Sequence, residues 1–122
     1  MNTYFYTYQR SDEQKVLICK DFIDIGKAWY DYGLKDASMD LLTDKYYKFY
    51  NTKEDDMIIA FYKAMVEMED LPIAFYIMLL TLSNNKYVDC GQSRIDLVNK
   101  ATEVITKEKG EDKVEELLKG LI

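Results

Sequence analysis

Residues 54–85 read EDDMIIAFYKAMVEMEDLPIAFYIMLLTLSNN, and this stretch decides the fold of the chain. It contains two apolar runs, each behind a cluster of acidic side chains. The second run, residues 71–85, carries no charged side chain. It is too short to cross a bilayer as a helix, which takes about 20 apolar residues. We therefore expect this run to be buried within the protein, as the central helix of a bundle.

Apolar side chains at helical spacing predict a long helix before this stretch. Ser11 and Gln14 match a capping box at its start, and Gly33 suits its C-terminal end. We expect Gly26, inside the helix, to mark a close approach of two helices. We also expect Trp29 to be largely buried. The apolar positions recur at steps of four and three residues: Ile18, Phe22, Ile25, Trp29 and Tyr32.

The same pattern predicts the remaining helices. Gly110 separates the last of them, which is short. One proline and five glycines leave few residues for the turns of an all-β fold. The sequence therefore predicts a mainly α fold, a single-domain bundle of five or six helices over residues 11–122. The residues expected to cap the second to fifth helices are Asp36 or Ser38, Thr52–Asp55, Asp70 and Ser93.

The N-terminal segment differs from the rest of the chain. Residues 2–8 are β-branched or aromatic at nearly every position, which is typical of a strand. We expect residues 1–10 to form a short aromatic strand or arm, with residues 86–90 as the candidate pairing partner. A length of 122 residues fits one domain, so residues 1–122 are expected to form a single helical domain.

The charge of the chain excludes several classes of partner. The formal net charge is −6, and neither half of the sequence is basic. Nucleic-acid binding and docking on anionic membranes both depend on clustered Lys and Arg. We therefore expect no direct nucleic-acid binding and no membrane association, and we expect a basic protein partner. No signal peptide is recognisable at the N-terminus, so the expected location is the cytoplasm.

The sequence offers little for catalysis. It contains no histidine, which removes the commonest general acid–base side chain and the usual nucleophile pairs. No phosphate-binding glycine loop is present either. We therefore expect no enzymatic activity and no cofactor. The two cysteines, Cys19 and Cys90, are expected to be free thiols. The weak candidates for a metal site are carboxylates at four-residue spacing, which suit Mg²⁺: Asp36, Asp40 and Asp44.

A tyrosine cluster and an acidic cluster are the candidate partner-binding residues. Tyrosine is enriched in protein interfaces because it combines a large contact area with a polar tip. Few arginines and many lysines indicate an AT-rich, bacterial or phage coding source. The candidates are Tyr46, Tyr47, Tyr50, Glu67, Glu69 and Asp70.

These observations favour a non-catalytic acidic binding protein of a bacterium or phage, such as a small inhibitor, immunity protein or antitoxin-like protein, acting on a macromolecular partner. Three alternatives stay open at this point. One is a small helical Mg²⁺-dependent enzyme that uses carboxylates. Another is a mimic of nucleic acid, in which carboxylates stand where phosphates would. The last is a structural homo-oligomer, in which tyrosines face a second copy.

Overall fold

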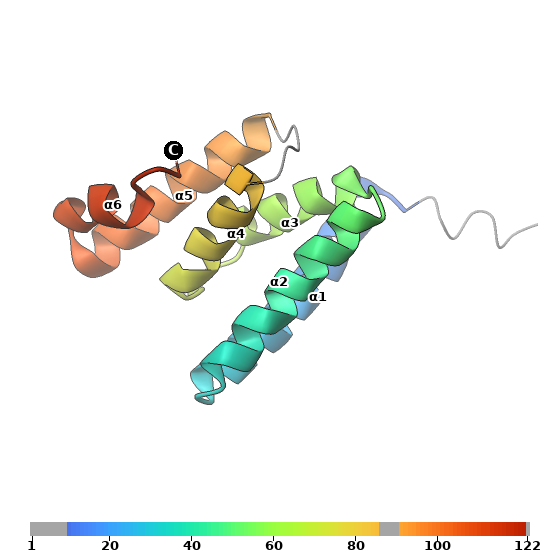
Figure 1. Cartoon of the computed structure of the whole chain (residues 1–122), viewed down its shortest axis with the longest axis horizontal. Helices are drawn as coiled ribbons and strands as arrows, with labels where there is room; N and C mark the ends of the chain where they lie inside the picture. The colour runs from blue at the N-terminus through green and yellow to red at the C-terminus, as the bar shows by residue number, and fades with distance from the viewer. Residues whose placement is uncertain (1–9, 86–90, 122) are drawn as a thin grey trace, which may run out of the picture.

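The computed structural model describes residues 10–85 and 91–121, and six α-helices make up 83% of it (Figure 1). No strand occurs within these ranges. The predicted mainly α bundle is therefore confirmed, while the predicted strand or arm at residues 2–8 and its candidate partner at residues 86–90 lie outside the described part. The helices are α1 (Asp12–Asp31), α2 (Lys35–Asn51), α3 (Asp55–Glu67), α4 (Ile73–Asn85), α5 (Gln92–Lys109) and α6 (Glu111–Leu118).

Helix α3 lies at the centre of the packing. It contacts α1, α2 and α5, and the exposed residues among its 13 are charged ones, such as Lys63 and Glu67. An apolar helix that buries most of its circumference needs neighbours on several sides. The helices around α3 provide them. Its buried side chains are Met57, Ile58, Ala60, Phe61, Tyr62, Ala64 and Met65.

The expectation that residues 71–85 form the central helix is wrong. Helix α4 buries one face, which includes Phe75, Tyr76, Leu79 and Leu80, while its other apolar side chains are partly exposed. Its main neighbours are α5 and α2. A helix that is apolar all round gives no sign in its sequence of which face is covered. Within the described ranges, no helix is both long and apolar enough to span a membrane.

Helices α1 and α2 run side by side as a hairpin (Figure 1). The ring of Phe22 in α1 lies 6.1 Å from Phe49 of α2 and 5.1 Å from Phe61 of α3, between ring centroids. These contacts join the hairpin to the central helix. Aromatic pairs at such separations contribute about 0.5–1.5 kcal/mol beyond the area they bury.

The predicted close approach at Gly26 is confirmed. The Ser38 hydroxyl on α2 donates a hydrogen bond of 2.6 Å to the Gly26 carbonyl oxygen on α1. A Cβ atom at position 26 would lie 3.4 Å from the Leu42 side chain. Ser38 is thus a buried contact between helices and not a cap, because α2 already begins at Lys35. The expected cap at Asp36 is also wrong, since this residue lies in the first turn.

The apolar stripe expected on α1 is only partly buried. Phe22 is buried, but Ile25, Trp29 and Tyr32 are 48%, 39% and 85% exposed. The expected burial of Trp29 is therefore wrong. Helical periodicity shows that a stripe exists, but not whether a neighbouring element covers it. The residues of α1 that are buried are Val16, Cys19, Phe22, Ile23 and Gly26.

The ends of α1 follow the sequence closely. The Ser11 hydroxyl accepts from the Gln14 amide at 3.1 Å, and the Gln14 side chain accepts from the Ser11 amide at 2.9 Å. At the other end, Gly33 has φ +102°. The Gly33 amide donates to the Tyr30 carbonyl and the Leu34 amide donates to the Trp29 carbonyl. This pair of bonds is a Schellman motif, so both predicted ends are confirmed.

Helix α2 ends in the same motif with lysine in place of glycine. Lys53 has φ +59°, its amide donates to Tyr50, and the Glu54 amide donates to Phe49. The Thr52 hydroxyl donates to the Lys48 carbonyl at 2.8 Å. Of residues 52–55, expected to open α3, residues 52–54 therefore close α2, and Asp55 is already the first residue of α3. The cap expected at Ser93 is wrong as well. The N-cap of α5 is Gly91, which has no side chain to form a cap, and Ser93 is buried within the first turn.

The C-terminal part closes the bundle through α5 and α6. Gly110, at φ +93°, separates the two helices as expected. Arg94 of α5 donates to the Leu121 carbonyl, and the Asn84 amide of α4 donates to the Gly120 carbonyl at 3.0 Å. These bonds hold the end of the described chain against α4 and α5.

Replacing Lys53 with glycine should raise the free energy of unfolding by about 0.5–1 kcal/mol. A residue with a Cβ atom destabilises the folded chain by about 1–2 kcal/mol when its backbone is in the left-handed region, and glycine avoids this strain. Glycine also gives the unfolded chain more conformational entropy, which cancels part of the gain. Urea denaturation measures the change. Lys53→Ala removes the same charge but keeps the Cβ atom, so it should not stabilise the chain. Equal stabilisation by both variants would assign the effect to charge instead of backbone.

Candidate functional site

The tyrosines predicted to bind a partner cluster at the C-terminal end of α2. Tyr46 is fully buried in the core, while Tyr47 and Tyr50 are partly buried and pack against it. The Tyr46 ring lies 5.9 Å from Tyr47 and 6.4 Å from Tyr50, between centroids. The assignment of Tyr46 to a partner surface is therefore corrected, because it shares the buried face of α2 with Leu42 and Phe49.

The predicted acidic cluster lies near the other end of α3, where ion pairs offset part of its charge. Glu67 pairs with Lys20 of α1 at 2.8 Å, and Glu69 pairs with Lys100 of α5. The hydrogen bond from Lys100 lowers the pKa of the Glu69 carboxyl. Asp70 is exposed and has φ +63°. Glu67 thus links α3 to α1, and Glu69 links the α3–α4 connection to α5, which the sequence pattern did not indicate.

The two halves of the predicted surface are far apart. The tyrosines lie before α3, which begins at Asp55. The acids lie at its end, since Glu67 is its last residue and the other two follow it. Helix α3 has 13 residues, which corresponds to a length of about 20 Å. The structure therefore brings the tyrosines together and keeps the acidic cluster apart from them. Contact of Tyr47, Tyr50 or Asp70 with a partner stays a prediction.

The weak metal candidates do not converge on a point. Asp36, Asp40 and Asp44 are exposed along α2. Successive carboxylates at this spacing stand about 6 Å apart along the helix axis. Across residues 10–85 and 91–121, no group of three cysteine or carboxylate side chains is arranged to hold a metal ion. Asp36 is placed where the positive end of the helix dipole favours a carboxylate.

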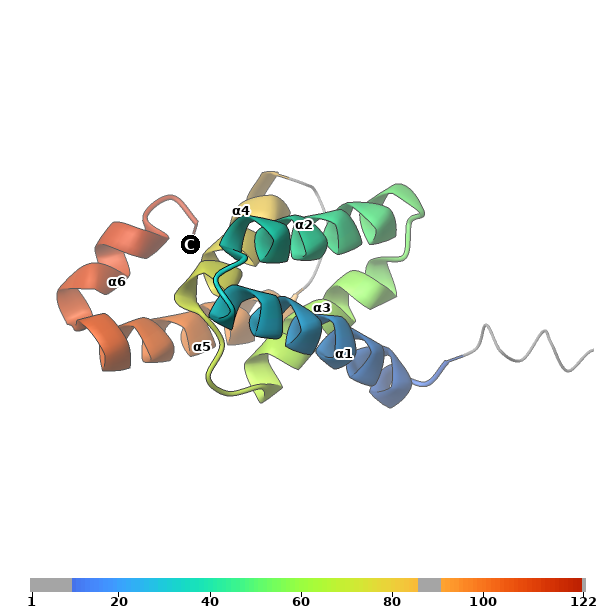
Figure 2. The ribbon, with the colours of Figure 1, turned by 90° about the horizontal axis from the view of Figure 1, so that it is seen from below.

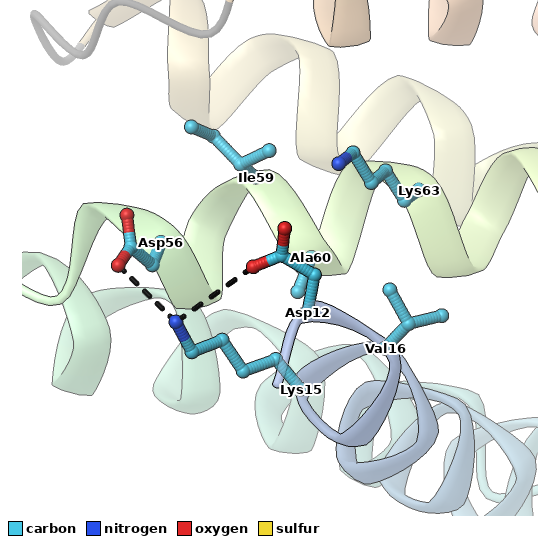
Figure 3. Close-up of a pocket in the computed structure, with 7 residues that line it drawn as sticks. All are labelled: Asp12, Lys15, Val16, Asp56, Ile59, Ala60 and Lys63. Carbon is cyan, nitrogen blue, oxygen red and sulfur yellow. Dashed lines mark hydrogen bonds and ion pairs between the residues drawn. The ribbon is translucent and has the colours of Figure 1, made fainter. Parts of the chain in front are cut away.

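A surface hollow of about 200 Å³ lies between α1 and α3. Figure 3 shows the Lys15 ammonium group between two carboxylates, 4.0 Å from Asp12 and 3.2 Å from Asp56. Val16 and Ala60 form part of the apolar wall. Exposed ion pairs of this kind contribute about 0–1 kcal/mol each. We assign this network to holding α1 against α3.

The negative charge that ion pairs leave uncompensated is concentrated around the turn of the α1–α2 hairpin, in residues 21–44. Residues 21–44 hold six aspartates and two lysines, and so carry −4 of the net charge of −6. The one ion pair that the described structure places there joins Lys27 to Asp31, both inside the range. Residues 54–70 are also acidic, but three of their carboxylates pair with lysines of α1 and α5. Residues 21–44 are therefore the acidic part that lysines from other helices do not offset.

Two buried titratable groups belong to the core. The Cys19 thiol is fully buried and free, donates to the Met57 carbonyl at 3.7 Å, and has its pKa raised by burial to about 12. Tyr76 is fully buried too, and its hydroxyl has no hydrogen-bond partner in the described part of the chain. Burial, with a smaller effect of nearby glutamates, raises the pKa of Tyr76 to about 12. Neither group ionises near neutral pH. Cys90 lies outside the described residues.

Replacing Tyr76 with phenylalanine should leave the free energy of unfolding at pH 7 unchanged or raise it by up to about 1 kcal/mol, because a buried hydroxyl without a partner is removed. The wild type should lose stability as pH rises from about 10 to about 12, since only the unfolded phenol ionises there. Tyr76→Phe should lack this part of the loss. Urea unfolding at pH 7, 10 and 11 measures both effects.

Tyr32→Phe serves as the matched control, because Tyr32 is 85% exposed. Tyr32→Phe should lose as much free energy of unfolding at alkaline pH as the wild type does. A Tyr76→Phe variant less stable than wild type by more than about 1 kcal/mol at pH 7 would show that the hydroxyl is hydrogen-bonded after all.

Comparisons of the chain with protein-family models, with curated proteins and with solved structures find no match. No relative therefore supplies a function for any of these surfaces. What distinguishes the molecule is the acidic segment of residues 21–44 around the turn between α1 and α2.

Proposed function

We propose that this chain is a non-catalytic acidic binding protein whose partner is a basic protein. A small inhibitor, immunity protein or antitoxin-like protein of a bacterium or phage, acting in the cytoplasm, fits this description. The observation that carries the proposal is the charge of −4 on residues 21–44, which no lysine from another described helix offsets.

Stability accounts for only part of this charge, through the Lys27–Asp31 ion pair and the place of Asp36 in the first turn of α2. Asp36, Asp40 and Asp44 are like charges at four-residue spacing, which destabilises a helix slightly. Their exposure means that they bury no surface. A surface of one sign does, however, steer a partner of the opposite sign and raise its association rate. The arrangement therefore favours binding over folding as its role.

Affinity capture from a lysate of the source organism tests the proposal. The bait is compared with a hairpin-neutral variant, in which Asp21, Asp24, Asp40 and Asp44 become Asn. The wild type should capture a basic protein, identified by mass spectrometry. The captured amount should fall as salt rises above 0.15 M, because the Debye length there is already about 8 Å and shrinks further. The hairpin-neutral variant should capture little of it.

The matched control neutralises four exposed acids elsewhere, with Gln in place of Glu13, Glu103, Glu108 and Glu115. It removes the same net charge and should retain the partner. The proposal fails if the captured protein is acidic or neutral, if no basic protein is captured, or if both variants lose the partner equally.

A further inference from the structure

Large apolar side chains are exposed together at the turn of the α1–α2 hairpin. Ile25, Trp29 and Tyr32 are 48%, 39% and 85% exposed, and Leu34 in the turn is 50% exposed. We call these four residues the hairpin-tip patch. Single exposed apolar residues are common on monomeric proteins, but neighbouring ones that include Trp and Tyr mark a contact surface.

The four residues lie close together along α1 and its C-terminal turn. Ile25, Trp29 and Tyr32 follow at steps of four and three residues, which places them on one face of α1. The Leu34 amide donates to the Trp29 carbonyl at 2.9 Å. In a Schellman motif, this bond usually brings the side chains of the two residues into apolar contact. Leu34 therefore extends the face of α1 around the turn.

The arrangement of the helices leaves this face uncovered in the described structure. Helix α1 has 20 residues, about 30 Å, whereas the central α3 has 13, about 20 Å. Helix α3 also crosses α1 obliquely and does not run beside it to the turn, so the hairpin projects past the other helices there, as Figure 1 shows, and Figure 2 views the molecule from that side.

The projecting end is held in place and is not a frayed terminus. The Tyr30 ring on the inner side of α1 packs edge-on against Phe75 of α4, with 5.6 Å between centroids. The Lys35 ammonium group lies 5.3 Å from the centre of the Tyr30 ring. A fixed surface loses little conformational entropy when a partner binds to it.

Aspartates border the patch. Asp21 lies one helical turn before Ile25, Asp24 is next to Ile25 in sequence, and Asp36 lies in the first turn of α2 beyond Leu34. All three are exposed, and none forms an ion pair with another described residue. An apolar centre that contains Trp and Tyr within a polar rim is the usual build of a protein interface.

We propose that the hairpin-tip patch is the surface that docks the basic partner. Trp29 enters an apolar pocket of that partner, and lysine or arginine side chains on the pocket rim face Asp21, Asp24 and Asp36. This inference rests on the proposed function and identifies its surface. It moves the contact away from the buried Tyr46 and from the ion-paired Glu67 and Glu69.

The charge of the rim selects this occupant over a second copy of the chain. Two copies joined through the same patch would bring together two segments 21–44, each of charge −4, and like charges across an interface oppose association. A partner whose pocket has a basic rim would be attracted to the same aspartates. The negative rim likewise repels nucleic acid, whose phosphates are negative.

The probe is a synthetic amphipathic helical peptide of lysine and leucine, with a glutamate–leucine peptide of equal length as its control. Trp29 is the single tryptophan, so its fluorescence reports directly on the patch. The lysine–leucine peptide should shift the Trp29 emission to shorter wavelength, and the glutamate–leucine peptide should not. In fluorescence anisotropy with labelled peptide, Trp29→Ala and Tyr32→Ala should each weaken binding at least about tenfold, because interface anchors dominate affinity.

Leu17→Ala and Ile95→Ala are the matched controls, since these apolar side chains are 58% and 55% exposed outside the patch. Both should bind the peptide as the wild type does. The inference is overturned by an absent emission shift, by normal binding of Trp29→Ala and Tyr32→Ala, or by equal loss in the controls. It is also overturned if light scattering shows a dimer of the free chain that Trp29→Ala abolishes. In each case the chain can still capture a basic protein in a salt-dependent way. The proposal for the docking surface can therefore fail while the proposed function stands.

Discussion

Burial of α3 on most of its circumference is the constraint on which the rest of the structure depends. Its apolar side chains reach in several directions, so α1, α2 and α5 must each turn a face toward it. Side chains such as Phe61 and Met65 contribute about 1.5–3 kcal/mol each when fully buried. Phe22 of α1 shows the consequence, because it meets both Phe61 of α3 and Phe49 of α2. The hairpin is therefore positioned by the central helix.

The short central helix also determines what is left uncovered. Because α3 is short and crosses α1 obliquely, it leaves the part of α1 nearest the hairpin turn uncovered. On α1 that part carries Trp29 and Tyr32, and the adjacent charges are aspartates that find no lysine on other helices. Apolar exposure and unpaired charge thus occur on the same projecting element, which is the physical basis for assigning binding to it.

The sequence predicts those features that depend on neighbouring residues. The Ser11–Gln14 capping box, the end of α1 at Gly33 and the close contact at Gly26 were all predictable, because each follows from local hydrogen bonding or from the lack of a side chain.

Features that depend on distant residues could not be predicted in this way. Tyr46 and Trp29 were both misplaced, since a stripe of apolar residues does not say which neighbour covers it. The pairing of Glu67 and Glu69 depends on lysines that are 47 and 31 residues away. The signal for the hairpin-tip patch was present in the stripe that ends at Tyr32, but it became readable only once the length of α3 in space was known.

Native-state hydrogen exchange of the backbone amides tests the central claim most directly. If α3 is the central helix and the hairpin turn projects from the body, amides of residues 57–65 should exchange slowest, through global unfolding. Amides of residues 28–38 should then exchange faster by at least about tenfold, through local opening. Slowest exchange in α4 with earlier exchange in α3, or protection at residues 28–38 equal to that of α3, would contradict the account.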